Sequence, residues 1–363
     1  MLPRLYEGKL DLESYNKNGL GFFNSVKSCE VTEERNGEYF LKLSIYKNDR
    51  LRDTVVPGMV VKAKSNSSDP PQLFEICDNI EVDKYGNLSL TAMHIKSVYM
   101  KNVTAQAWDV KSVTGTPAEI NAKISEVLAF QSGFTFYSDI TDSKAFKKGW
   151  STGESLEDIF YKEDGMIDIY GGSLYFDNFS VSLLKQRGRN TAKALRYGMN
   201  ISDYTQTITS AEVYSHILPY ADVEDLNDGD DIRIAIPPIE TGASVNEFKK
   251  VKLIDFSKKC KKYKVNSSNG AGYTELEAHL LELGNARVEK YKEKLTTPSV
   301  NIKVTYKAQL DDLQDLRLCD RVKLYYGNYI TRVRLIKTVY DSIHERYTSL
   351  EFGDKKLKLT DLI

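Results

Sequence analysis

The stretch Tyr39–Ile45 reads YFLKLSI, and its pattern is the clearest indication of β structure in the chain. Apolar side chains stand at every second position of it, at Tyr39, Leu41, Leu43 and Ile45. Because successive side chains of a strand point to opposite faces of a sheet, this period of two predicts a half-buried β-strand. The chain is therefore expected to begin with β structure.

More strands are predicted in the residues that follow this strand, up to residue 95. Segment 54–64 reads TVVPGMVVKAK, and its β-branched residues predict two strands broken at the Pro-Gly dipeptide. Leu73–Val82 and Asn87–Ile95 are predicted as further strands, joined by a turn at 83–86. Since about five strands with short connections and no clear helix form a small barrel or sandwich, residues 1–100 are predicted to be one β-barrel-like domain.

Residues 101–197 have a mixed pattern that predicts an α+β domain. Thr116-Pro117-Ala118-Glu119 combines a capping threonine, a proline at the first helical position and a glutamate at the third, which predicts a helix start. Glu154–Phe160 is predicted as a second, short helix. Strands are predicted at Leu174–Phe176 and Phe179–Leu184.

A second β-barrel-like domain is predicted in two pieces, residues 198–225 and 297–353. The first piece includes a predicted strand at Glu212–Ala221. The second piece includes Val300–Tyr306, where apolar residues again alternate with polar ones. These two pieces repeat the β character of the N-terminal domain without an obvious repeat of its sequence.

An α+β insertion domain is predicted from residues 226–296 together with 354–363. A strand is expected at Val251–Phe256. Its helix is predicted to run from Thr274 to about Leu295, with the first threonine and Glu277 as a capping box. The predicted fold class is therefore a β-rich α+β multidomain protein with two β-barrel-like and two α+β domains.

The composition is that of an ordinary soluble protein, because 41% of the 363 residues are hydrophobic and 28% are charged. The net charge of −1 argues against a dedicated nucleic-acid binder, which needs a basic excess to neutralise phosphates. The basic run Lys258–Lys264 is predicted to be a solvated face. Neither a signal peptide at Met1–Leu10 nor a membrane-spanning apolar run is found.

The four histidines have no spacing suited to a shared metal ion. His94 and His216 lie in strand patterns and are predicted to be satisfied core histidines. His279 stands beside the apolar stripe of its helix and is predicted to be exposed, and His344 is predicted to lie in a turn. No metal site is therefore predicted from histidine.

The four cysteines are Cys29, Cys77, Cys260 and Cys319. Their spacings are wide and none forms a CxxC pair, so neither a disulfide framework nor a zinc site is predicted. Cys77 lies inside an apolar strand pattern and is predicted to be a buried thiol. The sequence contains no GxSxG motif and no thiol-protease signature, so no catalytic residue is predicted.

Two segments match binding loops only in part. Gly19-Leu20-Gly21 begins like a dinucleotide-binding GxGxxG motif but lacks its third glycine and a surrounding βαβ unit. In the acidic segment Asp222–Asp231, aligning Gly229 with the fixed glycine of an EF-hand puts Leu226 and Ala235 at ligand positions, so that motif fails. A solvated connection or a looser calcium site is left open there, and no cofactor is predicted.

Several segments occur in an expected order along nearly the whole chain. They are Leu2–Tyr6, Asn18–Gly21, Cys29–Tyr39, Leu73–Ile76, Ala92–Ile95, Tyr170–Asn178, Arg187–Asn190, Arg196–Asn200, Leu318–Val322 and Tyr340–Gly353. Together they resemble the N-terminal, hub-forming portion of the phage tail endopeptidase (tail-associated lysin) family, which is similar to baseplate-hub-like prophage tail proteins. Glu75 stands where that family commonly has an arginine, and Cys319 where it commonly has a glycine.

The resemblance implies a structural hub at the tip of a phage or prophage-derived tail. Such hubs are homotrimers of four-domain subunits, whose two β-barrel-like tube domains form a pseudo-sixfold ring that continues the tail tube. The implied partners are a distal tail ring protein, tail tube and tape-measure proteins, with DNA passing through the lumen without specific binding. The implied location is the virion tail, assembled in the bacterial host cytoplasm, with a part in host attachment and DNA delivery. The motifs are assigned to the fold rather than to catalysis, so no enzyme is expected.

Two other functions stay open. In longer relatives a cell-wall hydrolase follows the hub, and here that domain would lie beyond Ile363. A peptidoglycan endopeptidase acting within the chain itself would instead need a histidine-based site in a cleft. A module that binds wall polysaccharide would use exposed aromatic residues such as Trp108 and Trp150.

Overall fold

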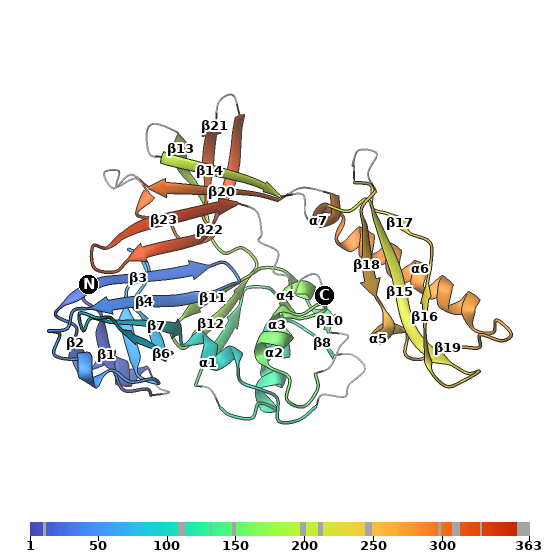
Figure 1. Ribbon diagram of the computed structural model, residues 1–363, viewed down its shortest axis with the longest axis horizontal. Coiled ribbons are helices and arrows are strands. Elements are labelled where there is room, and N and C mark those ends of the chain that lie inside the picture. The colour runs from blue at the N-terminus through green and yellow to red at the C-terminus, as the bar shows by residue number, and fades with distance from the viewer. Residues whose placement is uncertain are drawn as a thin grey trace. The chain divides into compact units, whose positions relative to one another are not determined.

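The computed structural model divides the chain into two compact units (Figure 1). Unit 1 comprises Met1–Gln206 and Asn301–Ile363, and unit 2 comprises Thr207–Val300. The predicted division into four domains is finer than these two units and stays a prediction. The structure describes residues 1–9, 12–107, 113–131, 133–146, 150–196, 201–209, 213–243, 249–296, 299–306, 313–326 and 329–353.

A 13-stranded sheet is the main feature of unit 1. Along its path the strands are β14 (Ile201–Thr209), β20 (Ser299–Tyr306), β23 (Arg346–Gly353), β22 (Tyr329–Asp341), β3 (Val26–Glu34), β4 (Tyr39–Ile45), β7 (Leu88–His94), β6 (Gln72–Val82), β5 (Val60–Ala63), β1 (Arg4–Tyr6) and β2 (Gly21–Phe22). Off this path, β21 (Arg321–Tyr326) pairs with both β22 and β13 (Asn190–Arg196).

Strands from the two ends of the chain meet inside this sheet. Figure 1 shows β3 beside β22, and the two pair antiparallel from Glu34 opposite Lys337 to Glu30 opposite Asp341. The N-terminal and C-terminal β regions, predicted as separate barrel-like domains, therefore share one sheet. Among the described residues no sheet closes into a barrel, so the barrel-like form is not confirmed.

The strand predicted at Tyr39–Ile45 forms, as β4. Tyr39, Leu41, Leu43 and Ile45 on β4 are all buried, each with at most 2% of its surface exposed. Full burial of such side chains contributes roughly 1.5–3 kcal/mol each. They pack with buried residues of neighbouring strands, including Val31, Val61, Phe74, Ile76, Leu90 and Ala92.

The prediction of two strands in segment 54–64 is wrong in its first half. Arg52–Thr54 is a 3₁₀ helix, and only Val60–Ala63 forms a strand, β5. Pro57 has no N–H to donate to a neighbouring strand, and Val56 is 49% exposed, so this side of the turn gains little from pairing.

The middle of unit 1 is the α+β region that the sequence predicts. A three-stranded sheet orders β11 (Ser173–Asp177), β12 (Ser180–Leu184) and β9 (Thr135–Ser138). Its other elements are the ribbon of β8 (Val113–Gly115) and β10 (Lys144–Phe146), with α1 (Lys96–Met100), α2 (Pro117–Glu126), α3 (Leu156–Tyr161) and α4 (Met166–Tyr170). The capping box at Thr116 and Glu119 is confirmed, and Ser155 caps α3.

Unit 2 is built around one central strand, β15 (His216–Asp225). It pairs with β16 (Asp231–Ala235), β17 (Ile239–Glu240), β18 (Val251–Asp255) and β19 (Lys264–Val265). The helices are α5 (Ser257–Cys260), α6 (Tyr273–Lys290) and α7 (Lys292–Thr296). The buried positions of β15 alternate and share a core with Leu276, Leu280 and Val288 of α6.

Two predictions in unit 2 are corrected. The α6 helix begins at Tyr273 rather than after a Thr274 cap, because Gly272, in a left-handed conformation (φ +82°), is the N-cap and starts the helix two residues earlier. Half of the acidic segment is strand rather than loop: residues 222–225 belong to β15 and β16 begins at Asp231, so the connection comprises only residues 226–230.

The length and apolar character of the helices test whether any of them could span a membrane. No helix in the described part of the chain is both long and apolar enough to cross a membrane.

Candidate functional site: a buried polar junction

Three segments far apart in the sequence meet in unit 1, and each contains a motif that the sequence analysis singled out. They are the end of β3 with the turn after it, the segment from β11 to Arg189, and the loop leading into β21. At their centre Arg187 donates a hydrogen bond from Nη2 to Oε1 of Glu33 at 2.6 Å, and both side chains are only 9% exposed. The second Arg187 amino group donates to the carbonyl of Leu174 at 2.9 Å.

The pairing with Glu33 keeps Arg187 charged despite its burial. Burial acts to lower the pKa of Arg187, but the charge and hydrogen bond of Glu33 outweigh it, so the pKa is raised. The guanidinium carbon also lies 4.9 Å from the ring centroid of Tyr175 on β11. A buried ion pair of this kind costs desolvation when it forms, yet removal of one partner leaves an uncompensated charge.

The turn between β3 and β4 fastens two neighbouring parts of unit 1. Arg35 donates from Nε to Oγ of Ser173 at 3.0 Å, and its backbone N–H donates to the carbonyl of Ile336 at 2.9 Å. Asn36, at φ +48°, accepts a hydrogen bond from the backbone N–H of Leu174 at 3.0 Å. The turn thus binds the α+β region on one side and β22 on the other.

In the loop leading into β21, the backbone at Cys319 lies close against the backbone at Gly188. Gly188 has φ +85°, and a Cβ placed on it would lie 2.2 Å from the carbonyl carbon of Cys319. Cys319 itself has φ +75°, the conformation that glycine adopts most readily and that suits the glycine expected there from the resemblance. The buried carboxylate of Asp320 accepts from the backbone N–H groups of Arg189 at 2.8 Å and Arg317 at 3.1 Å.

A second polar group lies near the junction and joins β6 and β7 to the turn after β11. His94 is fully buried, and its Nε2 lies 3.1 Å from Oε1 of Gln72, while Nδ1 accepts from the backbone N–H of Lys96. Gln72 also accepts from the backbone N–H of Asn178 at 2.9 Å and donates to the carboxylate of Asp177. Burial lowers the pKa of His94 well below its ordinary value, which keeps the ring neutral.

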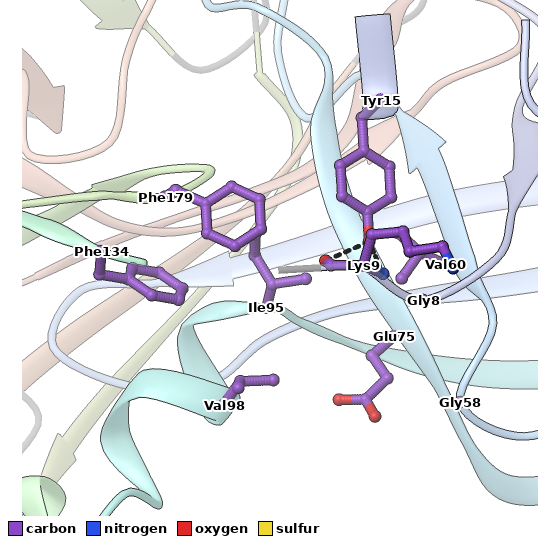
Figure 2. A pocket seen from close by; sticks show the side chains of 10 residues that line it. All are labelled: Gly8, Lys9, Tyr15, Gly58, Val60, Glu75, Ile95, Val98, Phe134 and Phe179. Carbon is purple, nitrogen blue, oxygen red and sulfur yellow. Dashed lines mark hydrogen bonds between the residues drawn. The ribbon is translucent and has the colours of Figure 1, made fainter. Parts of the chain in front are cut away.

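One cavity of about 270 Å³ opens between the β1–β5–β6 strands and the α+β region (Figure 2). The Tyr15 hydroxyl holds its rim by accepting from the N–H of Lys9 and donating to its carbonyl, both at 2.7 Å. The lining residues are Gly8, Lys9, Tyr15, Gly58, Val60, Glu75, Ile95, Val98, Phe134 and Phe179. Glu75, which departs from the family pattern, is the acidic residue of this largely apolar lining.

The structure places the four histidines in environments that differ in burial. His94 is a satisfied core histidine, as predicted, with its ring stacked 4.2 Å from that of Tyr39. His216 and His279 have side chains 13% and 23% exposed, so neither the core nor the exposed prediction holds fully. His344 lies in the predicted turn between β22 and β23.

The cysteine and tryptophan predictions are corrected in part. Cys77 is half-buried rather than buried, whereas Cys29, Cys260 and Cys319 are buried, and all four are free thiols. Trp150 is only 3% exposed, so it cannot present a ring to a polysaccharide. Trp108 lies outside the described residues, as do 197–200 of the family-like segment Arg196–Asn200.

The acidic segment of unit 2 uses its carboxylates for local contacts. Hydrogen bonds from Ser267, through its side chain and its backbone N–H at 3.0 Å, and from the backbone N–H of Asn227 at 3.0 Å lower the pKa of the Asp225 carboxylate. Asp222 pairs with Arg233 at 2.8 Å. Within the described residues, no group of three or more histidine, cysteine, aspartate or glutamate side chains is arranged to hold a metal ion.

The junction gathers motif residues that the resemblance singled out by sequence. Gln72 and the pairing of Glu33 with Arg187 were not predicted, since no local spacing connects residues so far apart. What the arrangement does chemically is fasten backbone to backbone through buried charges and amides.

The chain has the fold of prophage tail proteins. It matches prophage tail protein gp18 of Listeria monocytogenes EGD-e with a TM-score of 0.57 at 13% identity, over 99% of this chain and 96% of that one. It matches the 43 kDa tail protein of prophage MuSo2 from Shewanella oneidensis equally well (TM-score 0.57, 10% identity, 98% of each chain). The tail protein of Neisseria meningitidis MC58 gives 0.57 at 11% identity, over 99% and 98%.

Sequence comparison adds no closer relative. No family model matches the chain, and no curated protein sequence matches it significantly. Membership in the tail endopeptidase family therefore stays a resemblance.

Proposed function

We propose that this protein is a structural hub at the tip of a phage or prophage-derived tail. The observation that carries the proposal is the end-to-end fold match to three prophage tail proteins, which covers at least 96% of each of them. A match over the whole length leaves no part of the chain as an unrelated addition to that fold. The role would be carried out in the virion tail, after assembly in the host cytoplasm.

The assembly proposed is a homotrimer whose β regions continue the tail tube. The single sheet that joins the N-terminal and C-terminal β regions supports this, because it fastens two tube-forming parts of one subunit side by side. Glu33, which pairs with Arg187 in the buried junction, lies on β3 at that seam, opposite Thr338 of β22. The proposed neighbours are a distal tail ring protein, the tail tube and the tape-measure protein, with DNA passing through the lumen during delivery.

The hub is proposed to act without catalysis. The motif residues lie at turns and in the junction, where their side chains bond to backbone groups and to each other. If a wall hydrolase takes part, it would be a separate domain. Purified protein of this sequence is expected to leave peptidoglycan intact.

The mass of the particle in solution tests the proposal. Light scattering is expected to give about three times the chain mass of 41.2 kDa, and negative-stain microscopy is expected to show rings. Mixing with the tail tube protein is expected to place these rings at tube ends. A chain that stays monomeric at high concentration and forms no ring with tail partners would contradict the proposal.

A further inference from the structure

One face of the β21–β22 hairpin carries a cluster of cations. Arg321 and Lys323 are two residues apart on β21, so their side chains leave the sheet on the same face. The antiparallel register places Arg334 opposite Arg321, and Arg332 opposite Lys323. We call these four residues the basic face.

The basic face continues onto the next strand. Arg196 of β13 pairs with Tyr325 of β21, the next residue along the same face. The guanidinium carbon of Arg196 lies 4.2 Å from the centroid of the Tyr325 ring. An arginine over an aromatic ring is a cation–π contact, which holds this further positive charge in place.

Gathering like charges on one face does not by itself favour folding of the subunit. Like charges directly opposite each other on paired strands are destabilising. Among the described residues, Arg321, Lys323 and Arg332 form no ion pair. The neighbouring Arg35 shows the resulting field, since burial and then the charges of Arg334, Arg187 and Arg321 lower its pKa. A face of this kind is suited to an anionic partner.

The anionic partner could be a nucleic acid or an acidic protein surface, and the function proposed above favours the protein. A lumen that lets DNA pass cannot carry a dense row of fixed cations, because each would bind a phosphate. The basic face is therefore expected to meet acidic protein rather than nucleic acid. The near-neutral net charge of −1 means that the chain itself carries the balancing acidic residues somewhere else.

Unit 2 presents such an acidic surface at the turn between β15 and β16. Asp228, Asp230 and Asp231 are all exposed there, and we call these three residues the acidic turn. Nearby Asp222 and Glu224 are already neutralised by Arg233 and Lys264, at 2.8 Å each. Within the described part of the chain, the acidic turn has no such cation.

We propose that the basic face of one copy of this chain binds the acidic turn of a second copy. Two different surfaces of one chain then form a heterologous contact, which closes into a ring when the rotation between copies allows it. This inference rests on the ring assembly proposed above and names the charged surfaces that select the neighbour. Opposite charges at such a contact set register and association rate.

Charge reversal tests the contact directly. One variant carries Lys323→Glu with Arg332→Glu, a second carries Asp230→Lys with Asp231→Lys, and a third combines all four changes. At about 50 mM salt, where exposed charges are weakly screened, each of the first two is expected to lose the trimer by light scattering. The combined variant is expected to regain it, which shows that the losses are not misfolding.

A matched control and a crosslink complete the test. Lys258→Glu with Lys261→Glu makes the same change of net charge as the first variant on two exposed lysines that belong to neither surface, and it is expected to stay trimeric. In a variant with Lys323→Cys and Asp230→Cys, mild oxidation is expected to give disulfides between chains, seen as covalent oligomers on non-reducing gels. A disulfide formed within one chain would overturn the inference.

The remaining outcomes separate this inference from the proposed function. A wild-type protein that is monomeric under every condition removes the ring and this contact with it. A wild-type trimer whose mass is unchanged by both reversals overturns the contact and leaves the ring standing. If the assembled wild type binds a labelled DNA duplex and Lys323→Glu with Arg332→Glu abolishes that binding, the basic face belongs to DNA and the inference is wrong.

Discussion

Two Arg–carboxylate pairs, one in each unit, differ in how far they are exposed to solvent. The pair of Arg187 and Glu33 in unit 1 has both side chains 9% exposed, whereas in the pair of Arg233 and Asp222 in unit 2 they are 62% and 34% exposed. Each pair joins an arginine to a carboxylate, so the types of side chain do not reveal which pair is buried. The role of an ion pair therefore depends on its burial rather than on residue type: the buried pair holds a junction together, and the exposed pair lies at the surface of its unit.

The largest expected effect comes from breaking the buried pair. Arg187→Met leaves Glu33 charged and buried, which typically costs about 3–5 kcal/mol of unfolding free energy. Both tryptophans of the chain, Trp108 and Trp150, belong to unit 1 by sequence position, so urea unfolding followed by tryptophan fluorescence reports on this unit. The double variant with Glu33→Gln is expected to be less destabilised than the sum of the two single changes.

The exposed pair supplies the matched control. Arg233→Met in unit 2 is expected to leave stability unchanged within error, because solvent screens the charge that remains. Hydrogen exchange measured by mass spectrometry over β15 and β16 checks this. If Arg187→Met and Arg233→Met lowered the free energy of unfolding equally, the contrast between the buried and the exposed pair would be wrong.

The second prediction compares two glycines with the same backbone angle. Gly188 and Gly229 both have φ +85°, but a Cβ on Gly188 would meet backbone of Cys319 at 2.2 Å, whereas a Cβ on Gly229 meets nothing within 4 Å. Gly188→Ala is expected to cost about 3 kcal/mol from backbone strain plus displacement of the neighbouring chain. Gly229→Ala is expected to cost only the strain of holding an alanine in the left-handed conformation, about 1–2 kcal/mol. Urea unfolding and hydrogen exchange distinguish them, and similar costs would show that the 188–319 contact is loose.

The third prediction concerns the amide that joins β6 to the turn after β11. Gln72→Leu removes the acceptor used by His94 and by the backbone N–H of Asn178, leaving buried donors without partners. The expected loss is about 1–3 kcal/mol. Asn269→Ala, which removes a single bond to Ala271 on an exposed turn of unit 2, is expected to change stability far less. Thermal unfolding of both variants decides whether burial sets the difference.

The smallest predicted effect is a pH dependence from His94. Burial lowers its pKa well below the ordinary value of 6.5, so the unfolded chain takes up a proton in a range where the folded chain does not. Stability is therefore expected to fall as pH falls below 6.5, with a slope of about 1.4 kcal/mol per pH unit down to the folded pKa. His94→Gln is expected to flatten this slope in urea unfolding measured from pH 7 to 5. An unchanged slope would mean that another group carries the dependence.

Local patterns predicted local structure well and long-range structure poorly. The alternation of Tyr39–Ile45 and the capping box at Thr116 hold because neighbouring residues alone decide them. The cap at Thr274 failed because close approach of Gly272 to the Lys264 backbone, invisible in sequence, starts the helix earlier. The prediction that Trp150 is exposed was wrong because the burial of a ring depends on which residues pack around it in the fold.

The junction was predictable only in part for the same reason. The resemblance singled out the segments that contain Arg187 and Gly188, but it gave no partner for either. Pairing of the arginine with Glu33 spans more than half of unit 1 in sequence, and no spacing rule reaches that far. The joining of β3 to β22 was likewise missed, because strand pairing at such separation has no local signal.

That joining of β3 to β22 has a consequence for synthesis on the ribosome. The partner of Val26–Glu34 lies about 300 residues later in the chain, so at typical elongation rates it emerges roughly 15–60 s afterwards. Until then one edge of β3 is open to any passing strand, the situation in which nascent chains aggregate. Production of this protein is thus expected to depend on holdase chaperones more than its size alone would require.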